Sequence, residues 1–306
     1  MSEHTRVDEF LTSLLAICKP LESFEMPLLD AHGATLAADI YAGDRLVLRE
    51  GTRIRSTQIG LAASIGRDHL PTRPHPRVVV LSAGPDLVEP GQALKNASDE
   101  YETNSWLLTT AVREVGAVAY RVHSIPDNEE QLQKVIEDQL VRADLVVISS
   151  GPRSVEMMRE SLNALGEMHE REVAMAPTGH HSYGLIGPDR TPVITLTSDA
   201  SGAYIAFELF VRPMIRQMLG RKNLSHRKLS AILVGEISSA CEVRSFHEAL
   251  ISHENEVLRA KPVLAGERSE ANGLIVIDER PPTGSSLTSL PSGSEVSVIL
   301  FDRQSE

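Results

Sequence analysis

Between residues 77 and 219, short continuous apolar runs alternate with helix-length stretches that carry one apolar face. The apolar runs predict strands covered on both faces, since such strands have no polar side to alternate with. The stretches between them have the spacing of amphipathic helices. This alternation predicts a doubly wound α/β fold with a mostly parallel sheet. The expected strands are 77–82, 118–122, 144–149, 173–175 and 193–196, and the main expected helices are 103–116, 128–142 and 201–219, with Asp127 as the cap of the second.

The sequence changes character on both sides of this region. Before it, residues 1–70 offer helices at 6–18, 28–41 and 56–65 but too few apolar positions for a core of their own. After it, strand-like segments separated by Gly, Pro, Asn and Ser predict a small all-β domain, with a helix near Phe246 as the one alternative. The expected domains are therefore an N-terminal dimerisation and linker region at 1–70, an α/β domain at 71–222 and a C-terminal β-domain at 223–306.

Composition and charge exclude several classes of function. The formal net charge of −12, with no basic run, opposes binding to nucleic acid and to anionic lipid. No stretch approaches the ~20 apolar residues that span a bilayer, and the polar start lacks a signal-peptide core, so we expect a cytoplasmic protein without membrane insertion. Neither the two cysteines nor the adjacent His180 and His181 have the spacing of metal ligands, so no metal site is predicted.

Ligands of an open parallel sheet bind beyond the carboxyl ends of its strands. Three such ends are rich in small polar residues, at 82–86, 149–152 and 195–201. Each precedes an expected helix, whose first amides attract anions, and Gly84 allows a ligand to approach the backbone. The alternative is that these are ordinary tight turns. No phosphate-binding loop, dinucleotide fingerprint or serine-hydrolase elbow is present.

Several segments resemble the motifs of one family in the same order. The segments LSAGPDL (81–87), EYETN (100–104) and ADLVVISSG (143–151) are similar to the Ser-Thr-Gly-Asp-Glu-Leu, Tyr-Asp-Thr-Asn and Ala-Asp-Leu-Val-Val-x-Ser-x-Gly segments of molybdopterin molybdotransferases, the MoeA and gephyrin E-domain family. The ends of the chain, 271–279 and 292–301, resemble the strands of its small β-domain. The resemblance covers nearly the whole chain and implies a MogA-like molybdopterin-binding fold.

The resemblance also implies a ligand. Molybdopterin or its adenylylated form is expected to bind weakly at the strand ends, and the third turn is expected to lie opposite the other two. The residues expected there are Ser82, Gly84, Asp86, Thr103, Asn104, Ser149, Ser150 and Gly151, with Ser198, Asp199 and Ser201 opposite.

The departures from the family concern its chemistry. The lid-like domain expected after Asp44 is missing, Pro85 stands where the family has its first Asp, and residues 176–181 lack the family's lysine. Inserting molybdate into an anionic pterin requires cations or amides for the oxyanions and carboxylates for exchange at the metal. We therefore predict no catalytic residue and a catalytically degenerate protein.

The functions left open belong to different classes. The first expectation is a dimeric scaffold protein, because the one-sided apolar stripe of residues 6–18 has no adequate cover in its own chain and the family uses this region for dimerisation. By analogy with gephyrin, a protein partner is expected at the C-terminal β-domain. The alternatives are an active or specialised molybdopterin molybdotransferase, a molybdopterin carrier, and an unrelated small-molecule enzyme on the same sheet.

Overall fold

The computed structural model describes residues 4–84, 86–124, 128–150, 154–196, 199–254, 256–263, 269–281 and 287–301. The chain divides into two compact units, one of Met1–Phe10, Arg171–His180 and Ser225–Glu306 and the other of Leu11–Glu170 and His181–Leu224. Among the described residues, no helix has the length and apolar character to cross a membrane.

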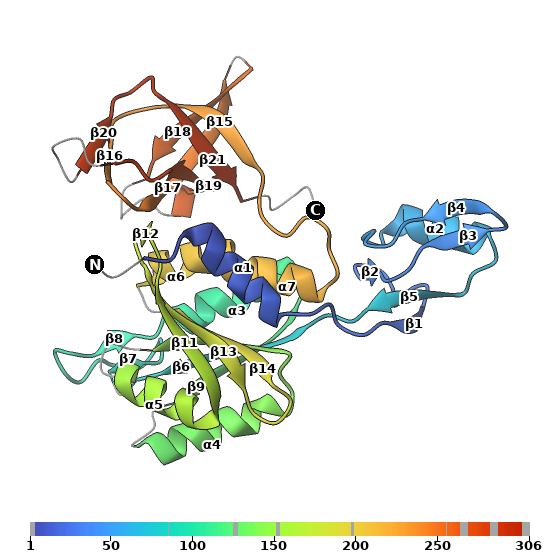
Figure 1. Cartoon of the computed structure of the whole chain (residues 1–306), viewed down its shortest axis with the longest axis horizontal. Helices are drawn as coiled ribbons and strands as arrows, with labels where there is room; N and C mark the ends of the chain where they lie inside the picture. The colour runs from blue at the N-terminus through green and yellow to red at the C-terminus, as the bar shows by residue number, and fades with distance from the viewer. Residues whose placement is uncertain are drawn as a thin grey trace. The chain divides into compact units, whose positions relative to one another are not determined.

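A six-stranded sheet with the order β11-β13-β14-β10-β6-β9 forms the centre of the α/β region (Figure 1). The neighbours β14, β10, β6 and β9 run parallel, and β13 runs antiparallel to β14. The mostly parallel α/β fold is thus confirmed. The strands are β6 (Arg77–Ala83), β9 (Val118–Ser124), β10 (Leu145–Ser150), β11 (Gly166–Glu172), β13 (His180–Ile186) and β14 (Thr191–Leu196).

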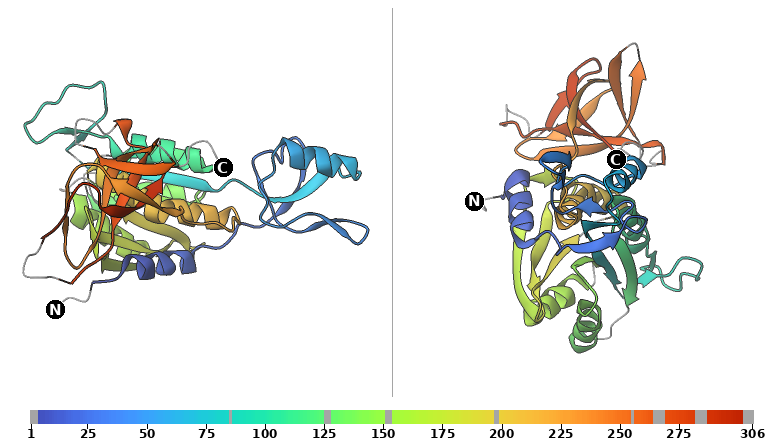
Figure 2. Two further views of the ribbon diagram at one scale, coloured as in Figure 1. Left: turned by 90° about the horizontal axis from the view of Figure 1, so that it is seen from above. Right: turned by 90° about the vertical axis from the view of Figure 1, so that its right-hand side faces the viewer.

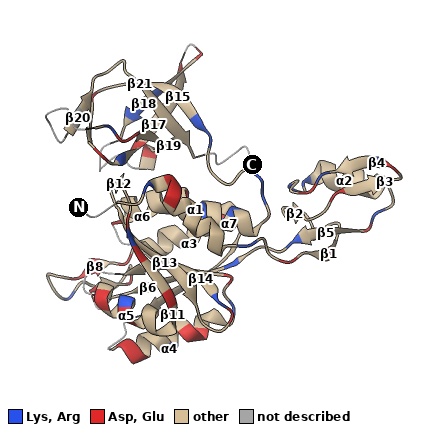
Figure 3. Ribbon diagram, viewed as in Figure 1, with Lys and Arg blue, Asp and Glu red and all other residues tan. Residues whose placement is uncertain are grey.

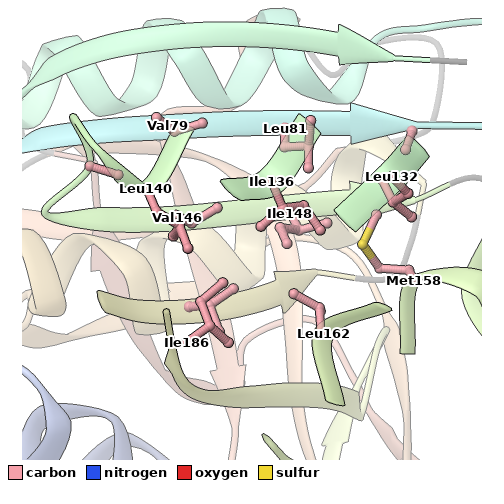
Figure 4. Packing of buried hydrophobic residues seen from close by; sticks show 13 residues of the cluster. Val79, Leu81, Leu132, Ile136, Leu140, Val146, Ile148, Met158, Leu162 and Ile186 are labelled. Atoms are coloured by element: carbon pink, nitrogen blue, oxygen red, sulfur yellow. The ribbon is translucent and has the colours of Figure 1, made fainter. Parts of the chain in front are cut away.

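Helices cover both faces of this sheet. On one face, Val79 and Leu81 of β6 and Val146 and Ile148 of β10 pack against α4 (Glu129–Leu140) and α5 (Val155–Leu165) in one apolar cluster (Figure 4). The other face is covered by α3 (Asn104–Val115). The outward positions of α4 and α5 are rich in Asp and Glu, coloured red in Figure 3. The continuous apolar runs of the strands and the 3.6-residue period of the helices therefore place the apolar residues as predicted.

The ends of these helices follow simple rules of backbone chemistry. Gly116 closes α3 with a φ of 99°, a left-handed conformation that costs glycine little. Asn128 caps α4, because its side chain accepts a hydrogen bond from the backbone N–H of Gln131 at 3.0 Å. The sequence assigned this cap to Asp127, which lies outside the described residues. The expected helix at 201–219 is three consecutive pieces, α6 (Ala200–Ala206), a π-helical turn (Phe207–Val211) and α7 (Arg212–Met218).

The N-terminal region differs from its prediction. The expected helix at 28–41 is wrong: the segment is a turn followed by two short strands, with a left-handed glycine at Gly33. The region also has its own buried cluster, which includes Leu36, Ile54 and Leu70, so the expectation that it lacks a core is wrong as well. Its elements are β1 (Phe24–Pro27), β2 (Thr35–Leu36), β3 (Ile40–Ala42), β4 (Arg45–Leu48), α2 (Ser56–Ser64) and β5 (His69–Arg73).

The first helix, α1 (Val7–Ile17), is covered without a second copy of the chain. Phe10 and Leu14 of its apolar stripe are fully buried in the single chain. The side-chain amide of Gln217 on α7 donates hydrogen bonds to the carbonyls of Leu15 and Cys18 at 2.7 and 2.6 Å. The argument that this stripe requires a dimer is therefore wrong, and dimerisation stays a separate expectation.

The C-terminal region is all β, as predicted. Its strands β17, β18, β15, β21 and β19 pair in that order, and β19 pairs back with β17, so the sheet closes around an apolar core (Figure 2). The alternative of a helix near Phe246 is wrong, because this residue lies in β17. The strands are β15 (Lys228–Leu233), β16 (Ile237–Ala240), β17 (Arg244–Glu254), β18 (Val257–Pro262), β19 (Gly273–Ile277), β20 (Leu287–Leu290) and β21 (Glu295–Leu300), and β12 (Met175–Ala176) adds to β17.

A buried arginine lies at the start of β17. The guanidinium of Arg244 donates to both carboxylate oxygens of Asp8 at 2.8 and 3.1 Å and lies 2.9 Å from Asp278 and 3.3 Å from Glu279. Arg6 also pairs with Glu279 at 3.1 Å. We call these five residues the Arg244 cluster. Each of its charges has an oppositely charged partner.

Candidate functional site

The parallel strands β9, β6, β10 and β14 end along one side of the central sheet, which we call the carboxyl edge. Ser82 of β6 is paired in register with Ser149 of β10 and with His123 of β9. Residues in register on parallel strands project to the same face of a sheet. Because Leu81 and Ile148 face α4 and α5, these three polar side chains lie on the face covered by α3.

Asn104 joins two of the predicted motifs. It is the first residue of α3, and its side-chain amide donates a hydrogen bond to the hydroxyl of Ser149 at 2.9 Å. Thr103 precedes it, is exposed, and makes no side-chain capping hydrogen bond. The capping carboxylate is that of Glu102, which accepts from the backbone N–H of Ser105 at 2.8 Å. Ser150, the last residue of β10, is half-buried.

Ser82 and Asp86 carry buried oxygens that lack a partner within the described part of the chain. Ser82 is fully buried and Asp86 is 6% exposed, and neither the Ser82 hydroxyl nor Oδ1 of Asp86 makes a hydrogen bond there. The carboxylate of Asp86 folds back over Gly84, since a Cβ built on Gly84 would lie 3.1 Å from Oδ1. Most buried polar groups in folded proteins are hydrogen-bonded. Unpartnered ones at a strand end therefore mark a position for a ligand or water.

The third predicted turn begins at the same edge, because β14 is the parallel neighbour of β10. Asp199 serves as the N-cap of α6, where its carboxylate accepts a hydrogen bond from the backbone N–H of Gly202 at 2.9 Å. Ser201 is half-buried on α6. Gly151 and Ser198, which the sequence also assigned to the site, lie outside the described residues.

Two residues of the edge were not predicted. Both ring nitrogens of His123 are buried without a hydrogen-bond partner among the residues that the structure describes. The same holds for the hydroxyl of Ser154, which is fully buried just before α5. His123 follows the predicted strand 118–122, so the strand-end rule would have found it if applied to that strand too. Ser154 has no comparable signal in the sequence.

Arg121, two residues before His123 on the same face of β9, is already neutralised. Its guanidinium pairs with Glu89 and, at 3.5 Å, with the buried Glu102. It also donates to the hydroxyl of Ser105 at 2.8 Å and lies 4.2 Å from the ring centroid of Trp106. Burial alone would raise the pKa of Glu89, but the hydrogen bond and charge of Arg121 outweigh it and lower this pKa. With two carboxylates around it, Arg121 offers little attraction to an anionic ligand.

The remaining groups at this edge can bind but show no metal-binding arrangement. Among the described residues, no group of three or more His, Cys, Asp and Glu side chains is placed to hold a metal ion. His181 is buried and packs edge-on against Phe210 at 5.5 Å. Ser82, Asp86, His123 and Ser149 together provide hydroxyl, carboxylate and imidazole groups, which suit a polar heterocycle.

Comparisons with known proteins identify the family of the chain. Residues 79–217 match the family described as a probable molybdopterin binding domain. Molybdopterin molybdenumtransferase 1 of Mycobacterium tuberculosis is 32% identical over 259 residues, which are 80% of this chain and 59% of that protein. Molybdopterin molybdenumtransferase 2 of the same organism is 31% identical over 253 residues, 79% of this chain and 62% of that protein. The chain thus spans less than two thirds of the length of these relatives.

Solved structures share the fold. A MoeA protein of molybdopterin biosynthesis from Pyrococcus horikoshii has a TM-score of 0.81 at 20% identity, covering 98% of this chain and 100% of that one. A molybdenum cofactor biosynthesis protein from Pyrococcus furiosus has a TM-score of 0.72 at 22% identity, with the same coverage.

Proposed function

Because the chain belongs to the MoeA family of molybdenum cofactor biosynthesis, we propose that it binds molybdopterin at the carboxyl edge and is not an efficient molybdenum-inserting enzyme. The observation that carries the proposal is the set of buried polar atoms without partners among the described residues there, on Ser82, Asp86 and His123. A site that had lost its ligand would be expected to replace such groups with apolar ones, since burying them unpaired costs free energy.

Binding is tested by titrating purified molybdopterin into the full chain. Asn104→Ala removes the hydrogen bond that orients Ser149, and a hydrogen bond is worth about 1 kcal/mol, or about fivefold in affinity. We expect Asn104→Ala to weaken binding at least to that extent. The control is Ser64→Ala, since Ser64 is exposed on α2. An affinity that Asn104→Ala leaves unchanged would place the ligand elsewhere.

The proposed loss of efficient insertion rests on charge. At the edge, Arg121 is paired with two carboxylates, and the segment 176–181 has no lysine to hold an oxyanion. The names of the curated relatives favour the alternative, an active molybdenumtransferase. Expressing this chain in a strain without its own molybdotransferase separates the two. Our proposal expects no rescue of molybdoenzyme activity, and rescue would establish the alternative.

A scaffold role is the second candidate, favoured by the C-terminal β-domain, which closes its own sheet around its own core. It requires a homodimer and a protein partner on that domain. Light scattering tests the first requirement: a dimer has twice the 33.4 kDa of one chain, and a mass of one chain contradicts it. For the second, point substitutions on the domain surface are better than deleting 226–306, because the deletion would also remove the partners of Asp8 and β12.

A further inference from the structure

The side chain of Asn272 extends the pairing of two strands in the β-domain. The backbone pairs between β17 and β19 end at Ala249 and Gly273. Asn272 lies just before Gly273, and its side-chain amide accepts a hydrogen bond from the backbone N–H of Ile251 at 2.7 Å and donates one to the carbonyl of Ile251 at 2.9 Å. Its backbone N–H donates to the carbonyl of Ala249 at 3.1 Å, and its carbonyl accepts from the N–H of Phe301 at 2.9 Å. Both its backbone and its side chain are therefore held.

Gly273 joins this strand pair to a third strand. It is in register with Ala249 of β17 and with Leu300 of β21, so it lies where the sheet of the β-domain closes. A Cβ at this position would lie 2.3 Å from the carbonyl oxygen of Ile299 and 2.4 Å from Cδ1 of Ile251. A larger residue would require the neighbouring backbone to move, which is the usual reason for a glycine inside a strand. The packing of the domain therefore requires glycine directly after Asn272.

An Asn-Gly pair is chemically labile in a flexible chain. The backbone nitrogen of the glycine, which no side chain shields, attacks the side-chain carbonyl carbon of the asparagine. A bond forms between this nitrogen and Cγ, the bond from Cγ to Nδ2 breaks, and ammonia leaves with the proton of the backbone amide. Water then opens the cyclic imide at either of its carbonyls and gives aspartate or isoaspartate. Of the six asparagines in the sequence, Asn272 is the one that precedes a glycine.

We propose that Asn272 and Gly273 form a deamidation site that the closed β-domain protects, so that conversion of Asn272 marks chains whose β-domain has opened. Closing the imide ring must turn the side chain and backbone of Asn272 together, which breaks the two hydrogen bonds to Ile251. The product cannot restore these contacts, because a carboxylate has no proton to donate to the carbonyl of Ile251. Isoaspartate also adds one carbon to the backbone, which disturbs the register of β19. Conversion therefore hinders the domain from closing again.

The test follows the conversion of Asn272 in the full chain by mass spectrometry of its peptides, in buffer and in denaturing urea at the same pH. In urea, we expect Asn272 to convert faster than every other asparagine. In buffer, its conversion should be at least about a hundredfold slower, because only the open fraction of the domain reacts. Val298→Ala leaves a cavity in the fully buried core of the β-domain and should speed conversion in buffer about tenfold. The matched control is Val79→Ala, in the core of the α/β region, which should speed it much less.

Three results would overturn the inference: equal rates in buffer and in urea, no preference for Asn272 in urea, or equal acceleration by Val79→Ala and Val298→Ala. The last would mean that the reaction follows unfolding of the whole chain and not opening of the β-domain. The effect of conversion on closure is tested with Asn272→Asp, which should melt below the wild type. Asn163→Asp, an exposed position on α5, is the control and should melt as the wild type does. An Asn272→Asp variant that also melts as the wild type does would contradict the effect on closure.

Discussion

The Arg244 cluster and the carboxyl edge both contain buried polar groups, but these groups are paired with one another in the cluster and lack partners at the edge. In the Arg244 cluster, Arg244 faces three carboxylates, and Arg6 pairs with one of these. At the carboxyl edge, by contrast, Ser82, Asp86 and His123 have buried atoms without partners among the described residues. Paired charges explain how a segment is held, whereas unpartnered polar atoms gathered at one strand edge indicate a position for a ligand or water.

The β-domain shows that an unpartnered atom alone does not make a site. The hydroxyl of Ser245 and Nε2 of His247 are also buried without partners in the described part of the chain. Both lie on one strand, β17, and desolvation lowers the pKa of His247. At the carboxyl edge, such atoms come from β6, from the turn after it and from β9, and Ser82 is in register with Ser149, which accepts the hydrogen bond of Asn104. Several elements contributing to one edge is what distinguishes the candidate site.

The largest expected effect is on the free energy of unfolding and concerns the Arg244 cluster. Arg244→Met would leave Asp8, Asp278 and Glu279 without their shared cation. We expect a loss of about 2 kcal/mol in the free energy of unfolding, less than for a fully buried pair because Asp8 and Asp278 remain more than half exposed. Urea denaturation measures it. Arg259→Met is the control, because its pair with Glu254 is exposed and worth less than about 1 kcal/mol.

Two buried serines of the α/β region, one with a partnered hydroxyl and one without, test directly whether unpartnered groups support the fold. The Ser105 hydroxyl is bonded to Glu102 and Arg121, whereas the Ser82 hydroxyl has no partner among the described residues. We expect Ser105→Ala to cost about 1–2 kcal/mol of stability and Ser82→Ala less than about 0.5 kcal/mol. Thermal unfolding of the two unliganded variants, side by side, provides the measurement. Equal losses would mean that Ser82 also supports the fold, and the distinction between the two regions would fail.

The smallest effect is the pH dependence of Asp8. Its hydrogen bond to Arg244 lowers the pKa of this carboxyl below its ordinary value of 3.8, despite partial burial. A carboxyl with a lowered pKa in the folded state adds stability above the unfolded pKa, and this contribution is lost as pH falls through the folded pKa. Wild type should therefore exceed Asp8→Asn in stability at pH 7, and the gap should shrink below about pH 4. A gap that is constant from pH 7 to pH 2.5 would contradict the pairing.

The sequence predicted those parts of the fold that depend on regular apolar patterns. The runs at 77–82 and 144–149 have a single interpretation because they are buried on both faces. The strand at His180–Ile186 was missed, because its two histidines, serine and glycine give no apolar period. The strand β17 was missed for a similar reason: its apolar residues are interrupted by His247, Glu248 and other polar ones. Antiparallel pairing with the next strand, β14 for the first and β18 for the second, rather than an apolar period of their own, makes both segments strands.

The site was predictable in position but not in its contacts. The rule that ligands bind at strand ends found Ser82, Asp86 and Ser149, and the resemblance to the family added Asn104. The hydrogen bond from Asn104 to Ser149 joins residues 45 positions apart, and no spacing in the sequence indicates it. Which polar atoms stay unpartnered depends on side-chain packing in three dimensions. Only the structure could therefore distinguish Asp86 from Asp199, which caps a helix.

The most direct test of the central claim is a crystal structure of the full chain with molybdopterin bound. The account predicts ligand density at the carboxyl edge, with polar ligand atoms within hydrogen-bond distance of the unpartnered atoms of Ser82, Asp86 or His123. Density for the pterin elsewhere on the protein, with Asp86 still unpartnered, would contradict it.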